Sequence, residues 1–141
     1  MSLLYLLDTC IVSEPVKMSA NKNVMHMLAS NEGKFAISSV VWHELHFGMF
    51  RLPESKKRDM LEKYLHEAIL PCLPILPYDE NAAELHGELR ASLASKGLTP
   101  AFTDSMIASI CLVNNLILVT RNVNDFKTFA DLKIENWFEI N

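Results

Sequence analysis

Short apolar runs alternate with longer amphipathic segments along this chain. The first run, Leu3 to Leu7, shows no polar alternation, which is expected of a central strand covered on both faces. Apolar runs that alternate with helical segments predict an α/β fold with a mostly parallel central sheet. We expect its strands near residues 3–7, 35–38, 73–76 and 116–120, with a last strand at 137–139.

The amphipathic segments predict helices near residues 22–30, 39–51, 54–69, 80–96 and 103–114, with a short turn near 124–129. Ser38 and Ser39 offer an N-cap for the second helix, while Asp79 caps the fourth and Gly97 ends it. Prolines bracket the third strand and predict that it is short or lies at a sheet edge: Pro71, Pro74 and Pro77.

Length and composition indicate one globular domain that covers residues 1–141. Half of the residues are apolar, 50%, and 21% are charged, with no low-complexity tract. No apolar run reaches the roughly 18 residues of a membrane span, and the first residues lack the basic segment of a signal peptide. We therefore expect a cytoplasmic protein with no membrane partner.

The cysteines are odd in number and lack a Cys-x-x-Cys spacing, and each is flanked by apolar residues: Cys10, Cys72 and Cys111. They are interpreted as buried thiols in a reducing compartment. The segment from His43 to His46 superficially resembles a zinc-protease helix. Its histidines are three residues apart instead of four, so they do not share one face in the way that motif requires.

Four acidic residues stand at element boundaries or on an apolar helix face. Asp8 ends the first apolar run and Asp125 follows the run from Leu116 to Thr120. Glu44 interrupts the apolar face of one predicted helix, and Asp104 begins another. Carboxylates in this layout predict an oxygen-ligand site for Mg²⁺ or Mn²⁺, and hence phosphodiester chemistry.

Each acid also has a structural alternative. Asp8 is suited to capping the turn or helix after its strand, and Asp104 to the first turn of a helix. Glu44 has the alternative of facing solvent at a helix edge, and Asp125 that of a turn former beside Asn122. Only the tertiary fold can unite these acids, because Asp8 and Asp104 are far apart in the sequence.

The net charge of −4 argues against nucleic-acid binding through a general basic surface. Local cations remain available to hold phosphates around an acidic centre, although solvated helix faces explain them equally well. These cations are Lys56, Lys57, Arg58, Arg90, Lys96, Arg121 and Lys127.

The short sequence segments around the four acids together resemble those of a PIN domain of the VapC toxin type, and the resemblance covers essentially the whole chain. They are Leu6-Leu7-Asp8-Thr9, Ile37-Ser38-Ser39-Val40 with Glu44-Leu45 and Gly48, Asp104-x-x-Ile107-Ala108, and Val119-Thr120-x-Asn122-x-x-Asp125-Phe126 before Glu135-Asn136-Trp137. The resemblance implies a three-layer α/β/α domain, Mg²⁺- or Mn²⁺-dependent endoribonuclease activity on RNA, a homodimer, and a VapB-like antitoxin partner.

The resemblance also implies the site residues. Asp8, Glu44 and Asp104 match the acids of that family, whereas the fourth acid stands in relatives either at the place of Asn122 or at that of Asp125. Asp8 and Asp104 would anchor the ion, with Glu44 and Asp125 completing the shell. Hydroxyl donors are expected near it, or alternatively as strand-end caps, from Thr9, Ser39 and Thr120.

Two other enzyme classes are excluded because the chain lacks residues that they require, and two further functions stay open. A haloacid-dehalogenase-like enzyme needs a second aspartate where Cys10 stands, and a receiver domain needs an acidic pair where Leu7 and Asp8 stand. A non-toxin PIN nuclease of RNA processing and a catalytically dead antitoxin-binding module stay open. Cys10 also departs from the Asn or Ser common after Asp-Thr in the family.

Overall fold

A parallel five-stranded sheet forms the centre of the chain, which a computed structural model describes over residues 2–139. Its strand order is β3-β2-β1-β4-β5, and every neighbouring pair is parallel. The strands are β1 (Tyr5–Leu7), β2 (Phe35–Ser38), β3 (Ile75–Leu76), β4 (Ile117–Val119) and β5 (Ile134–Glu135). The predicted α/β class with a parallel sheet is confirmed, and the strand flanked by prolines lies at an edge.

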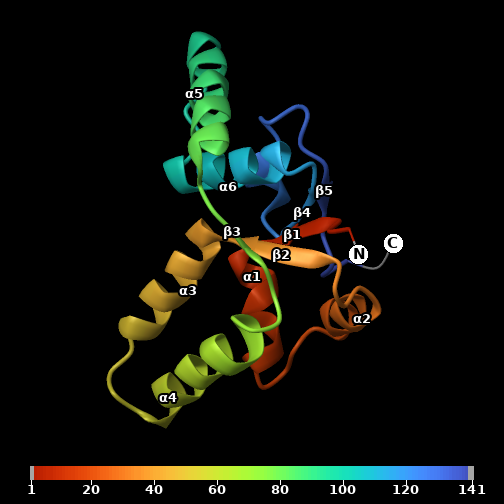
Figure 1. The fold of residues 1–141 in the computed structure, drawn as a ribbon, viewed down its shortest axis with the longest axis vertical. Coiled ribbons are helices and arrows are strands. Elements are labelled where there is room, and N and C mark those ends of the chain that lie inside the picture. Colours follow the sequence, from red (N-terminus) through yellow and green to blue (C-terminus); the bar gives the residue numbers. More distant parts are fainter. Residues whose placement is uncertain (1, 140–141) are drawn as a thin grey trace.

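Helices cover both faces of the sheet and give three layers (Figure 1). On one face lie α5 (Glu80–Ser95) and α6 (Phe102–Val113). On the other lie α1 (Thr9–Val12), α2 (Lys22–Ser30), α3 (Ser39–Phe50) and α4 (Lys56–Lys63). Shorter turns complete the fold: 3₁₀ segments η1 (Glu14–Val16) and η3 (Val123–Phe126), and a π-helical segment η2 (Tyr64–Ile69).

Two predicted elements differ from those observed. The last strand is β5 at Ile134–Glu135, not at 137–139, because Trp137 turns its ring into the core edge-on to Tyr5 at 5.1 Å. The helix predicted at 54–69 begins only at Lys56, where Ser55 caps it, and its last six residues are π-helical. The short helix α1 was not predicted.

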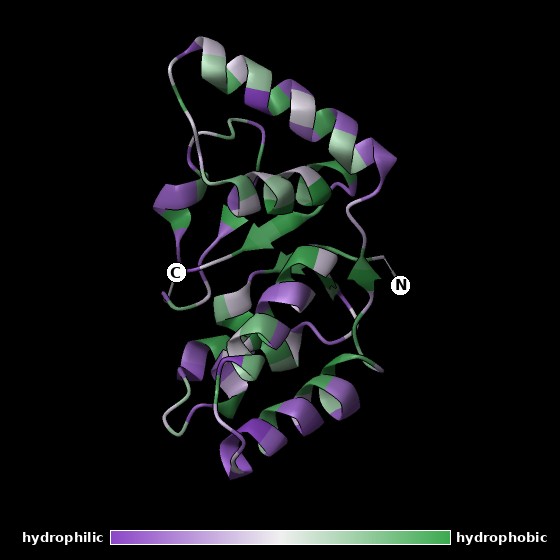
Figure 2. Cartoon of the chain, turned by 90° about the vertical axis from the view of Figure 1, so that its left-hand side faces the viewer, coloured by the Kyte–Doolittle hydropathy of each residue, from purple (hydrophilic) through white to green (hydrophobic). Residues whose placement is uncertain are grey.

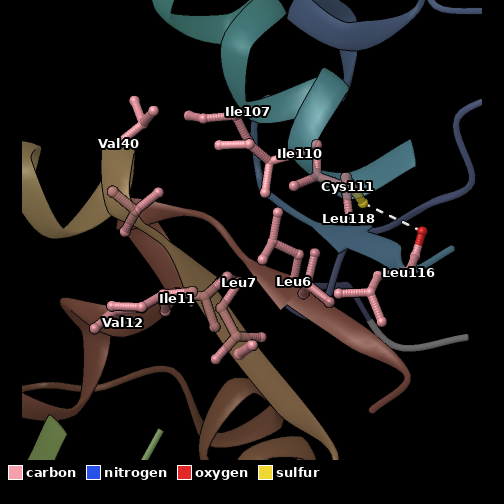
Figure 3. Close-up of a cluster of buried hydrophobic side chains, with 14 of the residues drawn as sticks. Leu6, Leu7, Ile11, Val12, Val40, Ile107, Ile110, Cys111, Leu116 and Leu118 are labelled. Atoms are coloured by element: carbon pink, nitrogen blue, oxygen red, sulfur yellow. Dashed lines mark hydrogen bonds between the residues drawn. The ribbon is translucent and has the colours of Figure 1, made fainter. Parts of the chain in front are cut away.

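The prediction that the three cysteines are buried is fully confirmed only for Cys111. Cys111 is buried and its thiol donates to the Leu116 carbonyl at 3.2 Å (Figure 3). Cys10 is half-buried, and Cys72 is exposed, which contradicts the prediction of a buried thiol there. Cys72 lies in the turn after η2, where its N–H bonds to Ile69 O at 3.0 Å and the residue is open to solvent.

The hydrophobic core lies between the sheet and its helices. Leu6 and Leu118 from the central strands contact Ile107 and Ile110 of α6, all nearly fully buried (Figure 3). The strands are mostly apolar, while the outer helix faces carry many hydrophilic residues (Figure 2). Burial of this kind contributes about 25 cal/mol per Å² of apolar surface, so the central strands are held rigidly.

The strand order reverses at β1. The chain runs outward from β1 through β2 to β3, then returns through α5 and α6 to β4 on the other side of β1. In such sheets, groups at the carboxyl ends of the strands beside the reversal face a common crevice. Asp8 follows β1, Thr120 follows β4, and α3 begins directly after β2, so this crevice collects the predicted site.

Candidate active site

Asp8 is fixed at the end of β1 by hydrogen bonds to both carboxylate oxygens. Its Oδ1 accepts from the Thr9 N–H at 2.8 Å, and its Oδ2 accepts from the Thr120 hydroxyl at 2.7 Å. The Thr120 oxygen in turn accepts from the Asn122 N–H at 3.0 Å. Asp8 is only 7% exposed, and its side chain also caps the N-terminus of α1. Capping a helix and lying in the candidate site are therefore compatible roles for this residue.

Glu44 faces Asp8 from α3. Its Oε1 accepts from the Thr9 hydroxyl at 3.1 Å, so Thr9 contacts Asp8 through its N–H and Glu44 through its side chain. The Ser38 hydroxyl caps α3 by accepting from the Val41 N–H at 3.1 Å, which sets where the helix begins. A Glu44 that points to solvent away from Asp8 is therefore excluded.

Asp104 lies in the first turn of α6 but is not the helix cap, which is Ala101. Burial, together with the negative charges of Asp125, Asp8 and Glu44, raises the pKa of Asp104 to about 6. Since like charges shift a pKa only at short range, the four acids share one electrostatic environment. We call Asp8, Glu44, Asp104 and Asp125 the acid cluster.

Asp125 brings its charge to the cluster from the loop after β4. It lies in η3, where its N–H bonds to Asn122 O at 3.1 Å, so the turn is held by the backbone and not by the carboxylate. Its charge raises the pKa of Asp8 as well as that of Asp104. Asn122 contributes its backbone N–H to Thr120, whereas Asp125 contributes a negative charge that acts on Asp8.

The pKa values of Asp8 and Glu44 are also raised, chiefly by burial. Hydrogen bonds from Thr120 and Thr9 offset part of this rise for Asp8, and the Thr9 hydroxyl does so for Glu44. The charge of Asp8 raises the pKa of Glu44, whereas nearby His43 lowers it. The cluster therefore holds like charges that repel one another in a partly dehydrated crevice.

This repulsion predicts a pH-dependent stability difference in EDTA. The folded pKa of Asp104, about 6, exceeds its ordinary value of 3.8, so the wild type loses stability as pH rises through this window. Asp104→Asn stays neutral and escapes that loss. We expect the variant to melt a few degrees higher than wild type at pH 7.5 and to lose this advantage near pH 4. A variant less stable than wild type at pH 7.5 would contradict this account of the cluster.

The donor set fits a hard divalent cation, because all four side chains offer carboxylate oxygens and Asp8 keeps lone pairs beyond its two hydrogen bonds. Within residues 2–139, both ion pairs, Lys17–Glu14 and Lys63–Glu67, lie outside the cluster. Over the same residues, no three Asp, Glu, His or Cys side chains are already arranged to hold a metal ion. The four carboxylates therefore do not form a finished coordination shell in this structure.

The remaining predicted groups have different surroundings. The Ser39 hydroxyl accepts from the Tyr78 N–H at 3.2 Å and lines a groove beside Glu44. Arg121 lines a second groove together with Asp125 and Asn122, and its guanidinium lies 4.4 Å from the Phe138 ring centroid. Arg121 is thus the predicted cation that the fold places beside an acid of the cluster.

Sequence reasoning placed Cys10 beside the site without finding its contacts. The Cys10 sulfur accepts from the Arg121 N–H at 3.4 Å and lies 3.9 Å from the Thr120 hydroxyl oxygen. Cys10 therefore ties α1 to the end of β4. His43 and Phe47 line one groove with Glu44, and their spacing of four residues puts these two on one side of α3. Sequence reasoning connected neither residue with the site.

Within residues 2–139, no helix has both the length and the apolar character needed to cross a membrane.

Comparison with known proteins extends over nearly the whole chain. The family model described as "PIN domain" matches residues 5–132. Ribonuclease VapC2 of Rickettsia felis is 34% identical over 137 residues, which are 96% of this chain and 98% of the relative. The tRNA(fMet)-specific endonuclease VapC of Shigella flexneri is 34% identical over 135 residues, which are 94% and 97% of the two chains.

The fold matches solved structures as well. The crystal structure of VapBC2 from Rickettsia felis bound to a promoter DNA fragment contains a chain 34% identical to this one. The TM-score is 0.77, and the match covers 96% of this chain and 99% of that chain. With the residues of the acid cluster at the carboxyl edge of a parallel sheet, this chain belongs to the PIN domain family, among its VapC-type members.

Proposed function

We propose that this chain is a Mg²⁺- or Mn²⁺-dependent endoribonuclease and acts in the cytoplasm as the toxin of a VapBC-type pair. The observation that carries the proposal is the acid cluster, whose members come from four separate elements. Burial, together with the charges of other members, raises the pKa values of Asp8, Glu44 and Asp104. Repelling carboxylates in a partly buried crevice are stabilised by a divalent cation. The ribonuclease names of the relatives support the same activity.

In this proposal, Asp8 and Asp104 hold the ion, and Glu44 and Asp125 complete its surroundings directly or through water. When bound, the ion lowers the pKa of a water molecule and offsets negative charge on the leaving oxygen. Thr120 and the Thr9 backbone orient the Asp8 carboxylate, and the Thr9 hydroxyl orients Glu44. These contacts hold the acids ready before the substrate arrives, which is how a fixed site favours a transition state.

RNA is the proposed substrate. The Shigella flexneri relative is named for action on tRNA(fMet), and the Rickettsia felis relative is named a ribonuclease. Because Asp8 is recessed, at 7% exposed, a phosphate reaches it more easily from a single strand or loop than from a regular duplex. Arg121 beside Asp125 is placed to hold a neighbouring phosphate.

A VapB-like antitoxin and a second copy of the chain are the proposed protein partners. The related VapC chain was solved in a complex named VapBC2 with promoter DNA. An inhibitory segment that carries an arginine to the acid cluster would pair with two carboxylates at once and silence the site.

Growth on induced expression tests the toxin proposal. Wild type should arrest growth, and co-expression of a short neighbouring antitoxin frame should restore it. Asp104→Asn should not arrest growth while remaining folded and bound to the antitoxin. RNA cleavage without growth arrest would indicate an RNA-processing nuclease, and antitoxin binding without cleavage would indicate a dead binding module.

A further inference from the structure

A groove of ≈ 450 Å³ runs beside the acid cluster, between α3 and the start of α6. Glu44 forms part of its wall, and Thr103, the residue before Asp104, forms another part. The groove is therefore continuous with the proposed catalytic crevice. Its lining combines an aromatic ring with hydrogen-bonding side chains, including Ser39, His43, Glu44, Phe47, Tyr78 and Thr103.

Phe47 presents its ring at this groove without a role in the core. Its side chain is 58% exposed and lies outside the core cluster, although it follows Glu44 by three residues on the same helix face. The guanidinium carbon of Arg51 lies 5.4 Å from the ring centroid, and the His43 ring lies 6.5 Å away. The exposed Phe47 ring thus lines the groove and has a cation close to it.

The opposite wall, Tyr78, is held in place by a directed chain of hydrogen bonds. Its oxygen lies 2.7 Å from His86 Nδ1, and His86 Nε2 lies 2.7 Å from the Ser105 hydroxyl. Ser105 donates its one proton to Phe102 O at 2.9 Å, so His86 Nε2 must donate and Nδ1 must accept from Tyr78. His86 and Ser105 are buried, so the position of Tyr78 relative to α6 is fixed.

We propose that this groove binds a nucleobase of the RNA strand, next to the phosphate held at the acid cluster, with the base stacked on Phe47. The inference rests on the proposed ribonuclease function. A flat exposed ring is the usual platform for single-stranded bases, and Arg51 above it supplies charge for the adjoining backbone. His43 and the Thr103 hydroxyl supply hydrogen-bonding groups for the edge of the base.

The test compares Phe47→Leu with Phe50→Leu. Phe50 is a matched control because it lies on the same helix, is 57% exposed, and has the guanidinium carbon of Arg58 5.3 Å from its ring centroid, yet it does not line the groove. Binding is measured with a labelled single-stranded RNA and Mn²⁺, on chains that also carry Asp104→Asn so that the RNA stays intact. We expect Phe47→Leu to weaken binding by about 5- to 150-fold, Phe50→Leu to change it little, and Phe47→Tyr to retain it.

A second measurement locates the base. Abasic sites are scanned along the RNA around the position that the wild type cleaves. At one position, loss of the base should weaken RNA binding by the protein that retains Phe47. The same loss should have little further effect on RNA binding by the Phe47→Leu variant, because both changes remove the same contact. Equal effects of Phe47→Leu and Phe50→Leu, or additive losses at every position, would overturn the subsite while leaving the ribonuclease intact.

Two other results separate the possible occupants. If Phe47→Leu abolishes antitoxin binding or self-association but leaves RNA affinity unchanged, the groove binds protein and the nucleobase proposal is wrong. If the wild type neither binds nor cleaves RNA, the proposed function fails, and the subsite fails with it.

Discussion

Asp8→Asn and Asp104→Asn are each expected to slow RNA cleavage by at least about a hundredfold, because even outer-shell changes at metal sites cost 10–100-fold. Each substitution keeps the shape of the side chain and removes a negatively charged oxygen donor. The amide oxygen that Asp8→Asn introduces can still accept one hydrogen bond, so the fold should survive. Initial rates on a labelled single-stranded RNA with saturating Mn²⁺ measure the effect.

A matched control distinguishes the loss of a carboxylate at the candidate site from the loss of a carboxylate elsewhere on the surface. Asp131→Asn makes the same change at an exposed loop position before β5, outside the acid cluster. It should leave the cleavage rate within about twofold of wild type, as expected of a surface change with little energetic effect. Circular dichroism confirms that each variant is folded. Cleavage by Asp104→Asn at the wild-type rate would show that this acid has no catalytic part.

The sequence predicted the central strands and the acids beside them for a physical reason. A strand buried on both faces must be apolar throughout, so the run that ends at Leu7 marked β1 and placed Asp8 at its carboxyl end. The same reasoning placed Thr120 at the carboxyl end of the strand predicted at 116–120, and its hydroxyl does donate a hydrogen bond to Asp8 at 2.7 Å. This part of the site follows from strand pattern and sheet topology.

The contact between Thr9 and Glu44 depends on tertiary packing and was not predicted. It joins residues 35 positions apart, and it requires α3 to begin at Ser39 with a particular rotation against β1. A shift of one residue in the helix start would turn Glu44 by about 100°, so local pattern alone does not fix it. The groove at Phe47 depends on the same rotation, since it lies between α3 and α6.

Sequence periodicity also failed where a large side chain decided the outcome. The apolar segment around Trp137 has strand character, but the buried indole donates to Glu135 at 3.0 Å and ends the pairing there. The π-helical end of the segment predicted at 54–69 likewise escaped prediction, since its residues fit an ordinary helical pattern. At Trp137, packing overrode the local pattern.

Mn²⁺ is expected to stabilise the folded protein by about 2.7 kcal/mol, or several degrees in melting temperature, at a concentration one hundred times its dissociation constant. The reason is that the folded chain brings the acid cluster together and the unfolded chain does not. The cation offsets the repulsion at Asp104, whose pKa is raised by burial and by the charges of the other three acids. Asp104→Asn should reduce this gain, because it removes one donor and one charge.

Melting curves of wild type and Asp104→Asn, each recorded at pH 7.5 in EDTA and with added Mn²⁺, test most directly whether the four acids form one metal-binding site. A shared site predicts a large upward shift with Mn²⁺ for wild type, a clearly smaller shift for the variant, and a variant at least as stable as wild type in EDTA. Equal shifts in the two proteins, or no shift in either, would contradict it.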